Sequence, residues 1–345
     1  MFEFGKKVIN VEPDENGFYT EMDIRNAKFA LSYSTLKATI DDPISLVAGK
    51  KDLNSHTGVI FGSIVDKMLF DGPESLKDDF AIVDSFKIPT SNSLAIADEM
   101  IKQCTEEGSE KKPGAELFLS CARDLKLFEK NKDEVITKKY TADTQAYCNA
   151  KIISASGKKF ITKDDFEKAE RAVEVLRTHE YTKPYLDQGR EGLEVFYQVG
   201  LIEDYGKNKI KGVYDIFIID HNRKIILPMD LKTTAFKGRD FKRAFIEYNY
   251  ALQAELYNFM AKSFAERNFP GYEVVDFRYM VLSSRDIENP FIFKFDEEVY
   301  KSKYVPRYNL KTLSDYIHEY QFISTNQEFN YPSEHVEKGF IELYV

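Results

Sequence analysis

Hydrophobic residues recur with helical spacing in two segments near the start of the chain, and this pattern predicts two helices. The first covers residues 29–40, where a serine would begin the helix and an Asp-Asp-Pro run would end it. The second covers residues 58–70. Residues 85–150 are the most polar region. We interpret them as helices and loops that form an insertion or a cover outside the core.

After about residue 160 the pattern becomes more regular and predicts strands as well as helices. A helix is expected to begin at Thr162, where an aspartate follows three residues later in a capping pattern. Three strands are predicted next, with a hairpin turn between the last two: Leu193–Ile202, Gly212–Asp220 and Lys224–Lys232. A long helix then begins at about Asp240. Two more strands and a last helix are predicted after it: Tyr279–Leu282, Phe291–Phe295 and a helix that carries Leu310, Leu313, Ile317 and Tyr320.

This order of elements favours a mixed α/β (α+β) fold, in which a three-stranded meander leads into a crossover helix. We expect one domain over residues 1–345, with its core at about 160–300. Pro228 lies inside the third strand, where proline removes a hydrogen-bond donor from the sheet. The sequence therefore predicts a bulge or an edge position there.

The overall charge disfavours one class of function. The 345 residues include 48 basic and 57 acidic side chains, which gives a net charge of −9. No global positive field attracts nucleic acid, so a protein that coats nucleic acid non-specifically is disfavoured. A nucleic-acid enzyme remains compatible with this charge, because a cleft can be locally basic and a carboxylate metal site adds negative charge.

The cysteines and the hydropathy exclude further classes. Three cysteines cannot supply the four thiolates of an iron–sulfur cluster, and they form no disulfide framework. No apolar stretch approaches the roughly 18 residues of a membrane span, and the first residues lack the apolar run of a signal peptide. We therefore expect a cytoplasmic protein with no membrane partner.

Four polar residues lie on the predicted strands where apolar residues are expected: Glu194, Asp215, Asp230 and Lys232. Because side chains alternate along a strand, Asp230 and Lys232 share one face. Two carboxylates held close on a rigid sheet repel each other and need a cation between them. Oxygen ligands suit Mg²⁺ or Mn²⁺, and a lysine beside the metal can steady an attacking hydroxide. The pattern predicts metal-assisted hydrolysis of a phosphodiester.

Weaker signals surround this group. The triplet Asp-Leu-Lys also occurs at 124–126, inside a predicted helix, where it is most simply a solvated face. The triplet at 230–232 therefore gains its meaning from the strand context and the upstream carboxylates. Gln253 and Tyr257 share one helix face, and an interfacial amide and a core-edge tyrosine are their simplest interpretation. Before them lies a basic cluster, which is either a solvated face or a set of phosphate contacts: Lys237, Arg239, Lys242 and Arg243.

Taken together and in this order, these residues resemble the PD-(D/E)XK nuclease superfamily. The run from Glu194 and Asp215 through Asp230-Leu231-Lys232-Thr233-Thr234 to Gln253-Ala254-Glu255-Leu256-Tyr257 is similar to the branch with a QxxxY helix motif. That branch includes RecE-type exonucleases, the RecB nuclease domain and phage recombination exonucleases. The segments LSYSTLKATIDDP and FGSIVDKML resemble the opening of RecE-like proteins. The resemblance covers about residues 29–320 and implies a restriction-endonuclease-like core, with a central mixed sheet flanked by helices.

The resemblance implies a metal site. Asp215, Asp230 and the backbone carbonyl of Leu231 would ligate one or two Mg²⁺ or Mn²⁺ ions, with Glu194 as a carboxylate of the same site. Where the family pattern has histidine, this chain has Asp66. Aspartate is a competent oxygen ligand for a second metal position, and the alternative is that Asp66 only caps or solvates a helix.

The resemblance also implies roles around the metal. Lys232 would position or polarise the attacking water, and Gln253 and Tyr257 would hold the lysine and the DNA strand in register. The basic residues Arg239, Lys242 and Arg243 lie directly after the predicted metal site in sequence, where phosphates would have to pass.

We therefore expect a metal-dependent DNA exonuclease that acts from duplex ends in recombination, repair or phage DNA processing. Two alternatives stay open: a structure-specific endonuclease that uses the same site, and a non-catalytic DNA-binding protein that retains the fold. RecE-like relatives are ring-shaped oligomers that resect the 5′ strand, so the resemblance also implies a homo-oligomer. The chain has no GxxxxGK[ST] phosphate loop. A helicase or annealing protein that acts with it would be a separate chain.

Overall fold

The computed structural model describes residues 12–48, 57–308 and 310–341, and its chain divides into two compact units. The first unit combines Met1–Gly62 with Glu174–Val345, and the second is the continuous segment Ser63–Val173. Two helices run across the boundaries between them: α4 (Thr57–Phe70) and α10 (Lys163–Thr178). We expected a single domain, and the predicted polar insertion at 85–150 lies entirely within the second unit.

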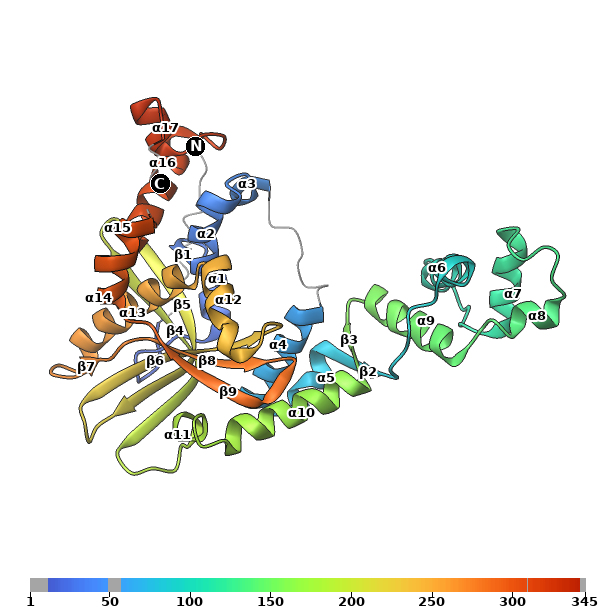
Figure 1. The fold of residues 1–345 in the computed structure, drawn as a ribbon, viewed down its shortest axis with the longest axis horizontal. Coiled ribbons are helices and arrows are strands. Elements are labelled where there is room, and N and C mark those ends of the chain that lie inside the picture. Colours follow the sequence, from blue (N-terminus) through green and yellow to red (C-terminus); the bar gives the residue numbers. More distant parts are fainter. Residues whose placement is uncertain (1–11, 49–56, 309, 342–345) are drawn as a thin grey trace. The chain divides into compact units, whose positions relative to one another are not determined.

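The first unit is built around a mixed sheet whose described strands pair in the order β1-β5-β6-β8-β9, with β4 also on β5 and β7 also on β6 (Figure 1). Strands β4, β5 and β6 form an antiparallel meander, β8 is parallel to β6, and β9 is antiparallel to β8. The strands are β1 (Ala30–Leu31), β4 (Leu193–Tyr205), β5 (Asn208–Asp220), β6 (Ile225–Thr234), β7 (Glu273–Val274), β8 (Arg278–Ser283) and β9 (Asp286–Lys294).

Helices cover both faces of this sheet. Two glycines of the sheet let a helix pack closely against it. A Cβ on Gly212 would meet the ring of Tyr257 on α13, and a Cβ on Gly200 would meet Ile24 on α1. The helices of the first unit are α1 (Glu21–Asn26), α2 (Tyr33–Asp41), α3 (Ser45–Ala48), α11 (Lys183–Leu186), α12 (Phe241–Glu247), α13 (Tyr250–Asn268), α14 (Glu297–Val299), α15 (Val305–Tyr308), α16 (Leu313–Asn326) and α17 (Ser333–Lys338), with short turns at Gly238–Asp240 and Tyr300–Tyr304. The predicted class, a mixed α/β fold with a central mixed sheet flanked by helices, is confirmed.

One local prediction is wrong, and the edge position predicted for Pro228 is confirmed only locally, within an internal strand. The helix expected from Asp240 is divided at Asn249, which adopts a left-handed conformation (φ 54°, ψ 47°) between α12 and α13. Pro228 lies in an internal strand, opposite Phe217 of β5. Its missing donor is tolerated because β6 pairs with β7 only up to Ile226 and with β8 only from Met229.

The second unit is mainly helical, as predicted for its polar stretch, and has its own core. A two-stranded parallel sheet joins β2 (Phe80–Val83) to β3 (Lys159–Thr162). The helices are α5 (Leu76–Asp79), α6 (Ser91–Thr105), α7 (Ala115–Asp124), α8 (Asp133–Thr137) and α9 (Ala142–Ala155), after a turn at Pro73–Ser75. Their apolar faces meet around buried Met100, Phe118 and Cys148. Across the described ranges of the whole chain, no helix is long and apolar enough to cross a membrane.

Candidate active site

The carboxylates of Asp215 and Asp230 lie where β5 and β6 separate. The pairing of the two strands ends at Ile216 and Met229, one residue short of the position where the aspartates would face each other. The backbone N–H of Leu231 then donates to Oδ2 of Asp215 at 2.7 Å. A side chain thus takes the place of a backbone acceptor, and β6 continues alongside β8 instead. We call this opening the β5–β6 fork.

The other oxygen of Asp215 is held by a residue that the sequence interpretation missed. Gln198 of β4 donates to Oδ1 of Asp215 at 3.0 Å. Its φ of 51° is unusual for a residue with a side chain, and strain of this kind concentrates at functional sites. The signal for Gln198 was present, because it is a polar residue in the middle of a largely apolar strand.

Asp230 is held from two sides. It is only 3% exposed, and its Oδ1 accepts a hydrogen bond of 2.7 Å from Nε2 of Gln253 on α13. Its Oδ2 is buried and makes no hydrogen bond of ordinary geometry among the described residues. The neighbour of Oδ2 is the ammonium group of Lys232, 2.5 Å away. The shared face of Asp230 and Lys232 is thus as the strand alternation predicts, while Gln253 contacts the carboxylate and not the lysine.

The electrostatics of this group leave negative charge to be balanced. Burial, with the charge of Asp230 as the second cause, raises the pKa of the Asp215 carboxyl. Burial alone would lower the pKa of Lys232, but Asp230 and its other neighbours outweigh that effect and raise it. The lysine therefore stays protonated. Burial and the neighbouring Asp230 disfavour negative charge on Asp215, a cost that a bound cation would relieve.

The donor set fits a small hard cation. Mg²⁺ is usually bound by one or two carboxylates, and water and phosphate oxygens complete its shell. Asp215 and Asp230 supply that number, and the buried Oδ2 atom of Asp230 has a lone pair to offer. Within the described ranges, no group of three or more His, Cys, Asp and Glu side chains is placed to hold a metal ion. The Leu231 carbonyl stays a predicted ligand.

An aromatic ring lies beside Lys232. Its ammonium group lies 5.1 Å from the centre of the Tyr250 ring, at the start of α13. The hydroxyl of Tyr33, on α2, donates to the backbone carbonyl of Tyr248. Burial raises the pKa of Tyr33, and the charges of Tyr250, Lys232 and Asp230 also act on it. The sequence interpretation did not single out these tyrosines, since nothing in an aromatic-rich chain distinguishes them.

Glu194 is not brought to the fork. It pairs with Ile219 at the far end of β5, four residues along the strand from Asp215, or about 13 Å at the usual rise per residue. Its carboxylate lies 3.3 Å from Nε2 of His221, and its side chain is half exposed. The expected position beside Asp215 is filled by Gln198, because the register of a strand pair cannot be read from alternation alone.

The remaining predicted residues are a half-buried aspartate, three exposed basic residues and a buried tyrosine. Asp66 is half-buried on α4, within the second unit, and its role as a ligand stays a prediction. Arg239, Lys242 and Arg243 are exposed at the turn before α12 and on α12 itself. Tyr257 is a core residue: it is 7% exposed, and its ring packs 4.8 Å from that of Tyr214.

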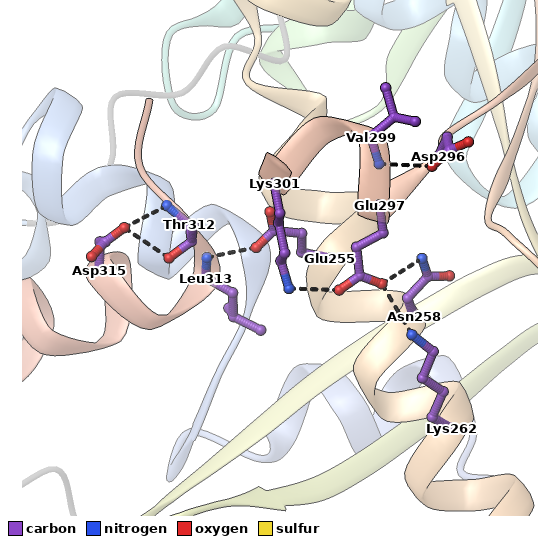
Figure 2. Close-up of polar contacts among 10 residues, drawn as sticks. All are labelled: Glu255, Asn258, Lys262, Asp296, Glu297, Val299, Lys301, Thr312, Leu313 and Asp315. Carbon is purple, nitrogen blue, oxygen red and sulfur yellow. Dashed lines mark hydrogen bonds and ion pairs between the residues drawn. The ribbon is translucent and has the colours of Figure 1, made fainter. Parts of the chain in front are cut away.

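A second polar group on α13 needs no ligand to explain it. Lys262, Lys301 and the amide of Asn258 all donate to the carboxylate of Glu297, as Figure 2 shows. These residues line a cavity of about 340 Å³. Burial would raise the pKa of Glu297, but Lys301 and Lys262 outweigh it and lower that pKa. The charges are paired with each other, so this group joins α13 to α14 and to the turn that follows.

Comparison with known proteins gives little beyond this geometry. No protein-family model matches the chain, and no curated protein does. Among solved structures, it is similar to a "Putative exonuclease" from Eubacterium rectale, with 12% identity and a TM-score of 0.31 over 75% of this chain and 89% of that one. It is also similar to the protein SSO0001, with 12% identity and a TM-score of 0.25 over 73% of this chain and 93% of that one. TM-scores this low transfer no residue's role.

Proposed function

We propose that this chain is a deoxyribonuclease that depends on Mg²⁺ or Mn²⁺ and shortens DNA from duplex ends. The observation that carries the proposal is the β5–β6 fork, where half-buried Asp215 and buried Asp230 lie on neighbouring strands and a lysine lies 2.5 Å from Asp230. Holding two carboxylates close together away from water is costly unless a cation binds them. The resemblance of the residue pattern to PD-(D/E)XK nucleases supplies the reaction class.

In this proposal each residue of the fork has a task. Asp215 and Asp230 hold the metal, which when bound polarises the phosphate and lowers the pKa of a bound water. Lys232 stays protonated because the carboxylates raise its pKa. It therefore orients the attacking water and stabilises negative charge on the phosphate, and does not serve as the base. Gln253 fixes Asp230 through its hydrogen bond.

The test is digestion of linear duplex DNA and of a covalently closed circle, each with Mg²⁺ or Mn²⁺. The wild-type chain is compared with Lys232→Ala and with Lys294→Ala. Lys294 is a matched control, because its ammonium group also pairs with an aspartate, Asp276, at 2.8 Å. We expect loss of the linear substrate alone, abolished by the first substitution and retained in the second.

The other outcomes point to the alternatives. Cleavage of both substrates, abolished by Lys232→Ala, identifies an endonuclease that uses the same fork. Binding of DNA with no metal-dependent cleavage of either substrate rejects the proposal in favour of a DNA-binding protein with this fold. A homo-oligomer and a separate annealing protein or helicase remain part of the proposal, and sedimentation of the purified chain tests the first of these.

A further inference from the structure

The exposed tyrosine Tyr248 lies next to Tyr250, whose ring lies next to the lysine of the fork. The ammonium group of Lys232 is 5.1 Å from the centre of the Tyr250 ring, and that ring is 5.7 Å from the ring of Tyr248. Tyr250 is half-buried, whereas Tyr248 is 43% exposed. Two neighbouring aromatic rings thus lead from the proposed cutting site to solvent.

The backbone that carries Tyr248 is fixed. Its N–H closes α12 on Ala244 at 2.9 Å, and its carbonyl accepts the hydroxyl of Tyr33. The next residue, Asn249, takes the left-handed conformation that separates α12 from α13, and its side chain donates to the hydroxyl of Tyr316. The backbone of Tyr248 is therefore held in place by hydrogen bonds, while its ring is exposed to solvent.

A cation lies beside this ring. Nζ of Lys37, on α2, lies 5.5 Å from the centre of the Tyr248 ring and 3.6 Å from the carboxylate of Asp41. Lys242 and Arg243 are exposed on α12, six and five residues before Tyr248. An aromatic face beside positive charges is the combination with which proteins bind single-stranded nucleic acid, since bases stack on the ring and phosphates meet the cations.

We propose that Tyr248 is the stacking platform for an unpaired base of the strand that is cut. A base inside a duplex has neighbours on both faces and a terminal base pair has one free face, whereas an unpaired base leaves both faces free and can turn towards the ring. The preferred substrate is accordingly a frayed or single-stranded end. This inference rests on the proposed nuclease function and adds to it the kind of end that the site accepts.

The experiment measures binding of a short single-stranded oligonucleotide by fluorescence anisotropy, with Ca²⁺ in place of Mg²⁺ to limit cleavage. A series of oligonucleotides moves one abasic site through the strand. For the wild type, we expect one position at which loss of the base weakens binding about tenfold. Tyr248→Leu binds the intact strand about tenfold more weakly and no longer responds to that abasic site. Tyr248→Phe retains the wild-type behaviour.

Tyr331→Leu is the matched control, because Tyr331 is 55% exposed and lies outside the fork and its aromatic surroundings. It is expected to bind like the wild type. A Tyr248→Leu variant that binds as tightly as the wild type, or that stays sensitive to the abasic site, overturns the stacking role. If the stacking role is overturned in this way while the wild-type protein still cleaves DNA with Mg²⁺, the proposed nuclease function is retained without it. A wild type that neither binds nor cleaves DNA overturns both.

Discussion

Gln253 offers the sharpest test of how the fork holds a metal. Its amide is 4% exposed and donates to Asp230 at 2.7 Å, so Gln253→Leu removes the donor and leaves a buried carboxylate oxygen without its partner. Orphaning such a group costs about 1–3 kcal/mol of folding free energy. Residues that orient a metal ligand also change metal affinity or activity by about 10- to 100-fold. We expect both losses in this variant.

The assay is cleavage of linear DNA over a range of Mg²⁺ concentrations, combined with urea unfolding. Asn258→Leu is the control, because Asn258 is 1% exposed on the same helix and its amide donates to the carboxylate of Glu297 at 3.2 Å (Figure 2). We expect both variants to lose about 1–3 kcal/mol of stability. Only Gln253→Leu should need about 10- to 100-fold more Mg²⁺, or cleave more slowly at saturation by a similar factor.

The result that refutes this reasoning is a Gln253→Leu protein that is less stable but has the Mg²⁺ midpoint and rate of the wild type. The hydrogen bond would then serve packing alone, and Asp230 would not be a metal ligand. Equal shifts of the Mg²⁺ midpoint in both variants would also refute it, since they would trace the effect to a loosened helix.

Three further predictions concern charge. Asp215→Asn should raise the thermal midpoint of the metal-free protein, because it removes like charge from the fork, and should abolish the stabilisation by Mg²⁺; a lower midpoint contradicts this. Glu194→Gln should leave the rate of metal-dependent cleavage within about twofold of the wild type, since Glu194 lies away from the fork. A large loss of cleavage would instead indicate that Glu194 belongs to the active site. Burial, with Lys28 as a second cause, lowers the pKa of Lys211 to about 8 from 10.5. The unfolded chain therefore binds more protons between those values, so stability should rise with pH across that window. In urea unfolding this rise should be smaller for Lys211→Met, and equal slopes would count against the shift.

The residues of the fork could be predicted because charge inside an apolar strand is costly and so draws attention. Asp215, Asp230 and Lys232 break the hydrophobic runs of their strands, and the structure places them together. Glu194 breaks its strand in the same way but lies elsewhere, because alternation identifies a face and leaves the register open.

Other features left no mark in the sequence pattern. The apolar spacing of α12 continues into α13, so the left-handed turn at Asn249 is invisible to periodicity, yet it determines where Tyr248 and Tyr250 lie. The division of the chain into two units was hidden for a related reason. Polarity marks residues 85–150, whereas the second unit extends to elements on both sides that read as ordinary core.

The pairing of β1 with β5 has a consequence for the order in which the protein folds. Ala30 and Leu31 lie beside Lys209 and Ile210, so the first strand must wait through synthesis of the whole intervening segment before its neighbour exists. Residues 63–173 form a continuous unit with its own core, and we expect this unit to fold first as the chain is made. Its folding brings the ends of a long loop closer and so lowers the entropy lost when β1 reaches β5. The nascent chain would therefore complete its helical insertion early and pair β1 with β5 late.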